Sequence, residues 1–388
     1  MTIVAESRRE SVDIGVTYWS AEVGPYIWHE FDRLRTAAEL QRIAATGHRV
    51  VRTLLAWDAF MPSSGAVDDA RLRDFEAFLD IAAQASLRVM PVLFAQSLAG
   101  SVMLPPFAVE VTRPRRGVRV LTGAVEQPGG PRDQYTDPLM IDAESIWLEA
   151  MLSGFAGHQA LFAWDLGHDP ATTVRPRRIA DLSGWVTMMS ARIRERGERC
   201  ALTLGAADIH TARAVRPALL APQLDMLGLA IDLSDAPFVD DSAGAGRRAV
   251  FTAQLAMRLA GGDAALVAHL GLNVAPQVAD AVDGFVDAGC SGIFAAMWSG
   301  GGPRTATVPP FDRHPELHHT AVVDSSGELS ESGVTWTEHV AREQERKQPL
   351  PWPDALDADA YYANLPDSLA DLRTAWEREA TDRPAMLE

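Results

Sequence analysis

Short apolar runs alternate with amphipathic helical patterns along most of this chain. Eight runs have the length and apolar content of buried strands. They span residues 14–19, 50–57, 88–94, 161–166, 201–206, 226–232, 265–271 and 292–298. Between two of them, Leu72, Phe75 and Leu79 recur at helical spacing and share one face. Strands that alternate with helices in this way predict βα units around a parallel sheet.

Eight βα units over about 300 residues predict a (β/α)8 or TIM barrel, which we assign to residues 1–346. An open doubly wound sheet is the alternative. It would carry a glycine-rich fingerprint after its first strand, where this chain has YWSAEVG. Residues 347–388 are predicted to form a stiff linker, KQPLPWP, and a short helical C-terminal extension. Leu369, Leu372 and Trp376 share one side of that helix and are expected to dock on the barrel.

The segment 95–137 has no clear periodicity and is rich in Pro, Gly and Arg. A loop of this length after a barrel strand is typically functional or disordered.

The amino-acid composition argues against some classes of binding partner. A net charge of −17 argues against nucleic acid and anionic membrane surfaces. The two cysteines, Cys200 and Cys290, are far apart in sequence and are expected to be buried free thiols. The first residues show no signal-peptide pattern, and no apolar stretch reaches the length of a membrane span, so we predict a cytoplasmic protein.

Candidate chemistry lies at the ends of the predicted strands, because the C-terminal strand ends of a barrel line its site. Aromatic faces beside hydrogen-bonding groups suit a sugar, although polar residues at such positions also cap helices. The candidates are Tyr18, Trp19, Arg52, Trp57, Gln96, His168, Asp169, Asp208, His210, Asp232, Asp235, His269 and Trp298.

Four segments carry a family resemblance: 47–94, 135–170, 292–302 (GIFAAMWSGGG) and 309–333. Together they resemble the clan A retaining glycoside hydrolases, especially the family 5-like cellulase and β-mannanase barrels. The resemblance implies that Arg52 stands at the arginine that contacts the nucleophile in that clan. It also implies that Trp298 stands at the tryptophan that forms the sugar platform.

The same resemblance implies that both catalytic glutamates are replaced. The clan has Asn–Glu where this chain has His168–Asp169, and a nucleophilic glutamate where it has His269. Retaining hydrolysis needs two carboxyl groups about 5–5.5 Å apart. Aspartate shortens the reach of glutamate by roughly 1.5 Å. A neutral imidazole does not stabilise an oxocarbenium ion, and the charge of Arg52 would oppose its protonation.

The leading hypothesis is therefore a pseudo-glycosidase, a barrel that binds a carbohydrate or glycosylated metabolite. Its substrate-binding candidates are Trp19, Trp57, Trp298, Tyr18, Gln96 and Asp232, around a former catalytic set of Asp169, His269, His168 and Arg52.

Three other hypotheses stay open. The protein could be an active enzyme, either a glycosidase with a modified Asp169/His269 pair or a repurposed barrel with His/Asp acid–base chemistry. His168, Asp169 and His269 together would make a two-histidine, one-carboxylate metal site, although no cofactor is otherwise predicted. The chain could also be a non-catalytic subunit of a larger assembly or a homo-oligomer.

Overall fold

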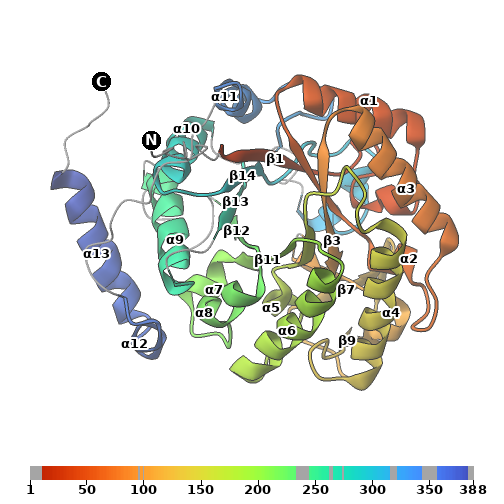
Figure 1. Cartoon of the computed structure of the whole chain (residues 1–388), viewed down its shortest axis with the longest axis horizontal. Coiled ribbons are helices and arrows are strands. Elements are labelled where there is room, and N and C mark those ends of the chain that lie inside the picture. Colours follow the sequence, from red (N-terminus) through yellow and green to blue (C-terminus); the bar gives the residue numbers. More distant parts are fainter. Residues whose placement is uncertain are drawn as a thin grey trace, which may run out of the picture.

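The eight predicted strands form a closed parallel barrel in the computed structural model of the protein (Figure 1). The structure describes residues 11–94, 97–98, 100–232, 244–261, 265–272, 275–314, 321–342 and 356–382. The first strand, β1, pairs with both β2 and β14, which closes the sheet and excludes the open alternative. The barrel strands are β1 (Asp13–Tyr18), β2 (Val50–Leu54), β3 (Arg88–Phe94), β10 (Trp164–His168), β11 (Cys200–Gly205), β12 (Met226–Ile231), β13 (Leu266–Leu270) and β14 (Gly292–Ala295).

Helices surround the barrel, as Figure 1 shows. Asp68 begins one of them, because its carboxylate accepts the N–H groups of Ala70 and Arg71. The longer helices are α1 (Arg33–Ala45), α3 (Asp69–Gln84), α4 (Pro138–Phe155), α6 (Ile179–Glu195), α9 (Ala245–Leu259), α10 (Ala275–Asp287) and α11 (Glu331–Val340). Shorter ones are α2 (Trp57–Phe60), α5 (Pro170–Thr173), α7 (Ala206–His210) and α8 (Pro217–Leu220), with 3-10 turns at Pro25–Trp28, Pro106–Ala108, Ala221–Gln223, Thr305–Thr307 and Phe311–Arg313.

Two apolar cores follow from the alternation of side chains along each strand. The larger core fills the space between the barrel and the helices. A smaller layer fills the barrel itself and consists of Val50, Met90, Phe162, Ala163, Ala201, Met226, Val267 and Phe294. Since these residues lie near the starts of the strands, the opposite end of the barrel is left for polar side chains.

The segment 95–137 is a compact insertion in its described part. One small sheet contains β4 (Ser97–Leu98), β5 (Ser101–Met103), β7 (Arg119–Thr122) and β8 (Val125–Gln127), and a second pairs β6 (Val109–Glu110) with β9 (Gly130–Pro131). Strands of two to four residues are too short to show a periodic pattern, so the sequence did not predict them.

The C-terminal extension contains α12 (Ala358–Ala363) and α13 (Asp367–Asp382). Trp376 in α13 donates a hydrogen bond of 2.6 Å to Gln254 of α9 and packs edge-to-face on Phe251. Tyr361 and Tyr362 in α12 donate to the carbonyls of Ile209 and Asp208 in α7, over 2.9 and 3.3 Å. The tail helices therefore contact the barrel through α7 and α9, as expected. The predicted linker 347–353 lies outside the described residues.

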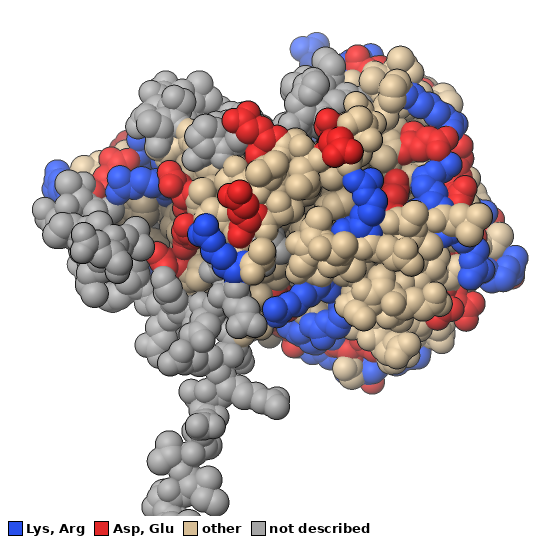
Figure 2. All heavy atoms as spheres, turned by 90° about the horizontal axis from the view of Figure 1, so that it is seen from above, with Lys and Arg blue, Asp and Glu red and all other residues tan. Residues whose placement is uncertain are grey.

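Neither the distribution of surface charge nor the two cysteines indicates a particular function. Acidic and basic side chains are interspersed around uncharged areas on the face seen in Figure 2. Cys200 and Cys290 are both buried, as predicted. Across the described ranges, no helix has both the length and the apolar character that crossing a membrane requires.

Candidate ligand site at the carboxyl end of the barrel

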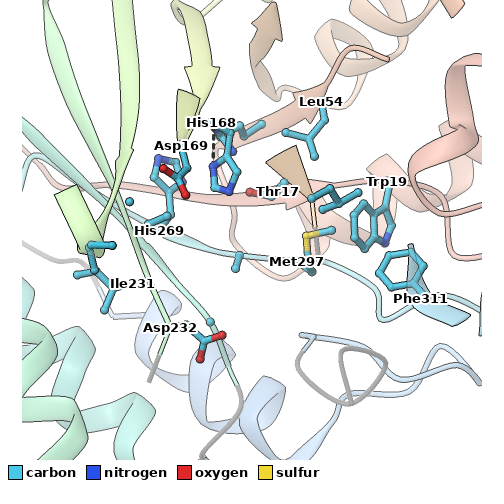
Figure 3. Close-up of a pocket in the computed structure, with 18 residues that line it drawn as sticks. Thr17, Trp19, Leu54, His168, Asp169, Ile231, Asp232, His269, Met297 and Phe311 are labelled. Carbon is cyan, nitrogen blue, oxygen red and sulfur yellow. Dashed lines mark hydrogen bonds between the residues drawn. The ribbon is translucent and has the colours of Figure 1, made fainter. Parts of the chain in front are cut away.

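A cavity of about 400 Å³ opens where the barrel strands end (Figure 3). This volume is within the range of small-molecule sites, about 300–1,000 Å³. The residues that line it are Thr17, Trp19, Arg52, Leu54, Leu98, His168, Asp169, Gly205, Ala206, Ala207, Ala230, Ile231, Asp232, His269, Gly271, Ala296, Met297 and Phe311. The sequence candidates Trp19, Arg52, His168, Asp169, Asp232 and His269 are thus brought together.

Arg52 is held by a buried ion pair beneath the cavity. Its Nε and Nη2 atoms donate to one oxygen of Asp165, over 3.0 and 2.7 Å. Both side chains are almost fully buried, at 1% and 0% exposure. The charge of Arg52 is therefore compensated inside the protein. The resemblance implied that this arginine would contact the residue at the end of the seventh barrel strand; its observed carboxylate partner is on β10.

A β-bulge in β10 brings Asp165 and His168 to the same side of the strand. In a regular strand, residues three apart point to opposite faces. Here the register with β11 shifts between Asp165 and His168. An extra residue of this kind re-aims the side chains that follow it. His168 consequently approaches Arg52, with its Nδ1 3.5 Å from Nη2.

Thr203 fixes the hydrogen-bonding role of His269. The Asp165 carboxylate, ionised in its pair with Arg52, can only accept hydrogen bonds. Thr203 therefore donates its single hydroxyl proton to Asp165, over 2.8 Å. Arg52 also donates to that hydroxyl over 3.2 Å. The Nε2 atom of His269, 3.4 Å from the same oxygen, must then be the donor. Its Nδ1 is left as a buried acceptor with no partner in the described part of the chain.

Space for this arrangement comes from neighbouring strands. A Cβ atom at Gly228 of β12 would overlap the hydroxyl of Thr203. On the other side, the ring of His269 packs edge-to-face on Phe294, with centroids 5.3 Å apart. The ring of His269 therefore lies between the polar side chains around Thr203 and the apolar layer that fills the barrel.

Both cavity histidines are neutral. Burial, and second the charge of Arg52, lower the pKa of His168 to about 3. Burial, then Arg52 and His168, hold the pKa of His269 well below its ordinary value. Since the guanidinium of Arg52 only donates, the Nδ1 of His168 accepts and its Nε2 carries the proton.

Asp169 has a strained backbone that places its carboxyl group over Gly205. Its φ of 47° is left-handed, which few non-glycine residues adopt. A Cβ atom at Gly205 would lie 2.9–3.0 Å from the carboxyl atoms of Asp169, so a larger residue there would displace that carboxyl group. One oxygen of Asp169 is buried without a partner among the described residues. Burial raises the pKa of Asp169, against hydrogen bonds from Thr172 and the charge of Arg213.

Asp208 is a second buried carboxyl group next to Gly205. It accepts the N–H of Gly205 over 3.2 Å and a hydrogen bond of 3.2 Å from Arg213. Burial, and second the charge of Asp169, raise the pKa of Asp208 to about 7. The two carboxyl groups therefore compete for one partly exposed arginine.

Not every candidate lies at the cavity. Tyr18 points to the helical layer, where it bonds Glu39 and stacks on Phe78. Trp57 packs between Phe94 and Phe107 and Trp298 packs against His48, with 1% and 2% exposure. Gln96 and Asp235 lie outside the described residues, and His210 is buried beside Thr252.

These placements correct the expected aromatic platform. The rings of Trp57, Trp298 and Tyr18 pack against other side chains and are not among the residues that line the cavity. The aromatic rings that do line it are Trp19 and Phe311, which pack edge-to-face with centroids 5.3 Å apart. Trp19 is fixed by a 2.7 Å hydrogen bond to the Ser299 carbonyl.

Two residues of the polar layer were missed at the sequence level. Asp165 and Thr203 lie inside predicted strands, and Asp165 is the partner of Arg52. A charged residue within an apolar run, such as Asp165 in LFAWDL, was the available signal. The hypothesis of a metal at His168, Asp169 and His269 has no support, because no metal-binding group of three or more His, Cys, Asp or Glu occurs in the described ranges.

Comparisons with known proteins identify solved structures that have a similar fold. No protein-family model and no curated protein matches the chain by sequence. Among solved structures, the exo-β-1,4-mannosidase Op5Man5 from Opitutaceae bacterium strain TAV5 is 19% identical, with a TM-score of 0.73 over 87% of this chain. The alignment spans only 60% of the length of that mannosidase.

Two GH5_18 proteins match over more of their own length. The one from Streptomyces cattleya, in complex with Manb1-4GlcNAc, has a TM-score of 0.78 at 17% identity, over 95% of this chain and 92% of that one. The one from Bifidobacterium longum subsp. longum has a TM-score of 0.75 at 16% identity, over 88% and 80%. The chain therefore has the (β/α)8 barrel fold of these structures. At these identities the likeness concerns the fold and leaves the chemistry to the site itself.

Proposed function

We propose that this barrel binds a carbohydrate or a glycosylated metabolite in its cavity without cleaving it by the retaining mechanism. One observation carries the proposal. At the end of β13 stands a buried neutral imidazole, His269, whose Nε2 bonds Thr203. The adjacent Arg52 is already paired with Asp165.

Retaining hydrolysis requires a carboxylate nucleophile beside a carboxylic acid. The described lining of the cavity contains no glutamate, and its carboxyl groups are those of Asp169 and Asp232. His269 does not replace a nucleophilic carboxylate, because a neutral ring offers no negative charge to an oxocarbenium-like transition state. Its lowered pKa also makes it a weak base.

The carbohydrate part of the proposal rests on the fold and on the lining. The GH5_18 neighbour from Streptomyces cattleya was solved with a bound Manb1-4GlcNAc. In this chain the corresponding end of the barrel offers aromatic rings at Trp19 and Phe311 and hydrogen-bonding groups at His168 and Asp169. Apolar surface combined with a few directional polar groups is typical of a small-molecule site.

One observation favours a second candidate, an active enzyme that uses Asp169 as an acid. Burial raises the pKa of this carboxyl group, which is how a general acid keeps its proton. His269 would then be the base of a modified pair. This candidate predicts turnover with a pH dependence that disappears in Asp169→Asn.

The test compares the wild type with Asp169→Glu/His269→Glu on a panel of aryl glycosides. The matched control, Asp169→Asn/His269→Gln, makes the same positions polar without adding carboxylates. We expect saturable binding but no turnover by the wild type. Turnover by the double glutamate variant alone would show that the cavity still orders a glycoside. Wild-type turnover that the amide control abolishes would overturn the proposal in favour of the second candidate.

A further inference from the structure

The two sides of the cavity differ in chemistry. In Figure 3, Trp19, Met297 and Phe311 lie together, away from the group of His168, Asp169 and His269. Most of the described lining is apolar, and its larger apolar side chains are Trp19, Leu54, Leu98, Ile231, Met297 and Phe311. The apolar share of the wall therefore exceeds the polar share.

The polar side has few hydrogen bonds left for a ligand. Nε and Nη2 of Arg52 are used by Asp165, Thr203 and His168, and its Nη1 has no partner among the described residues. His168 presents its Nε2–H as a donor, and Asp169 has an oxygen without a protein partner in the described chain. A bare sugar carries hydroxyl groups around its whole ring, and each one placed against the apolar wall loses its water without gaining a partner. Such a wall favours an apolar group instead.

The charged groups around the cavity narrow the class of ligand further. The positive charge of Arg52 is cancelled by Asp165, which is 2.7 Å away. The other ionisable groups of the described lining, apart from the neutral histidines, are Asp169 and Asp232. In the described lining, an anionic ligand would meet these carboxyl groups and no cation other than Arg52, which is already paired. The cavity therefore disfavours sugar acids and sugar phosphates.

We infer that the ligand is an uncharged glycoside with an apolar aglycone, the sugar facing His168 and Asp169 and the aglycone lying against Met297, Phe311 and Trp19. This inference rests on the proposed function and names its ligand class. A cavity of about 400 Å³ has room for one sugar ring with a compact aglycone. It differs from the Manb1-4GlcNAc seen in the structural neighbour, whose second unit is itself a polar sugar.

Calorimetric titration of the full chain with matched methyl and p-nitrophenyl glycosides of β-mannose and β-glucose tests the inference. We expect at least one p-nitrophenyl glycoside to bind about tenfold or more tightly than its methyl counterpart, because its aromatic ring leaves water. Equal affinities within such a pair would overturn the inference while leaving the proposed function standing. Binding of p-nitrophenol as tight as that of the glycoside would overturn the sugar part. If no compound binds, the proposed function fails as well.

Two further binding experiments test where the aglycone lies and whether the ligand is uncharged. Met297→Gln keeps the side-chain volume but makes this wall polar, and should reduce the aryl preference to about threefold or less. Met188→Gln, a half-buried methionine of α6 outside the cavity, is the matched control and should leave the preference unchanged. p-Nitrophenyl β-glucuronide should bind at least about tenfold more weakly than the glucoside. Equal or tighter binding of the glucuronide would contradict the uncharged class.

Discussion

Two clusters of polar side chains lie beneath the cavity, and they differ in how completely they are paired. In the first, Arg52, Asp165 and Thr203 are joined by four hydrogen bonds of 2.7–3.2 Å. In the second, the carboxyl groups of Asp169 and Asp208 share Arg213, whose side chain is 25% exposed. One cluster is balanced in charge and the other has an excess of carboxyl groups.

The first cluster has a structural role, whereas the second changes its charge with pH. The first cluster fixes the tautomer of His269, and burial, with the charge of Arg52 second, lowers the pKa of that ring and keeps it neutral, so its hydrogen bonds do not depend on a proton near neutral pH. The second cluster favours the protonated form of its carboxyl groups, so its charge changes with pH. Hydrolysis by the retaining mechanism would need the reverse, an ionised carboxylate where His269 stands.

The largest effect is expected from breaking the first cluster. Asp165→Ala leaves Arg52 buried without its counter-charge and should lower the free energy of unfolding by about 3–5 kcal/mol. Urea denaturation measures the loss. The double variant Arg52→Met/Asp165→Leu removes both charges and should lose clearly less. Additive losses would show that the pair is not a coupled unit.

The second cluster predicts a pH dependence of stability. The folded pKa of Asp208, about 7, lies above its ordinary value of 3.8. Above pH 4 the unfolded chain releases this proton more readily than the folded one, so stability from this group is present below pH 4 and lost as the pH rises to about 7. We expect a loss on the order of 2 kcal/mol between pH 4.5 and pH 8, measured by urea denaturation.

Asp208→Asn should flatten that pH dependence, because the amide does not titrate. Asp371→Asn, at an exposed position of α13, is the matched control and should keep the wild-type slope. An unchanged slope in Asp208→Asn would assign the pH dependence to another group.

A smaller effect is expected where the second cluster meets the cavity. In Gly205→Ala the new methyl group would lie 2.9–3.0 Å from the Asp169 carboxyl group and displace it. We predict a loss of about 1–2 kcal/mol, together with weaker ligand binding. Gly184→Ala, in α6 with no atom within 4 Å of the added group, is the control and should gain about 0.5–1 kcal/mol. Equal effects at both sites would mean that Asp169 is not packed against Gly205.

The smallest effect concerns the tail helix that supports Asp208. Tyr361→Phe removes a hydrogen bond of 2.9 Å to the Ile209 carbonyl and should cost about 1 kcal/mol. Amide hydrogen exchange should then accelerate in α7 and stay unchanged in α3, on the other side of the barrel. Uniform acceleration in both helices would indicate a global loss of stability instead.

Most of the fold could be predicted from the sequence because strand and helix patterns alternate clearly. The small sheets of the insertion could not, since their strands contain two to four residues. At the site, the strand ends pointed to Arg52, His168, Asp169 and His269, all of which line the cavity.

The direction of each side chain was the part that sequence could not supply. Tyr18 and Thr17 are neighbours on β1, and only the alternate one, Thr17, faces the cavity. Asp165 and His168 share a face because of the bulge in β10, which no sequence pattern marks. The resemblance suggested Trp298 as the platform, yet its ring packs beside His48. Face and register are decided by pairing between distant strands.

One experiment tests the central claim, binding without hydrolysis, most directly. The wild-type protein is equilibrated with the tightest p-nitrophenyl glycoside in a dialysis cell, and bound ligand and free p-nitrophenol are quantified in the same sample. The account predicts saturable binding to one site and recovery of the glycoside intact. Release of p-nitrophenol in proportion to the protein concentration, and its loss in Asp169→Asn, would contradict it.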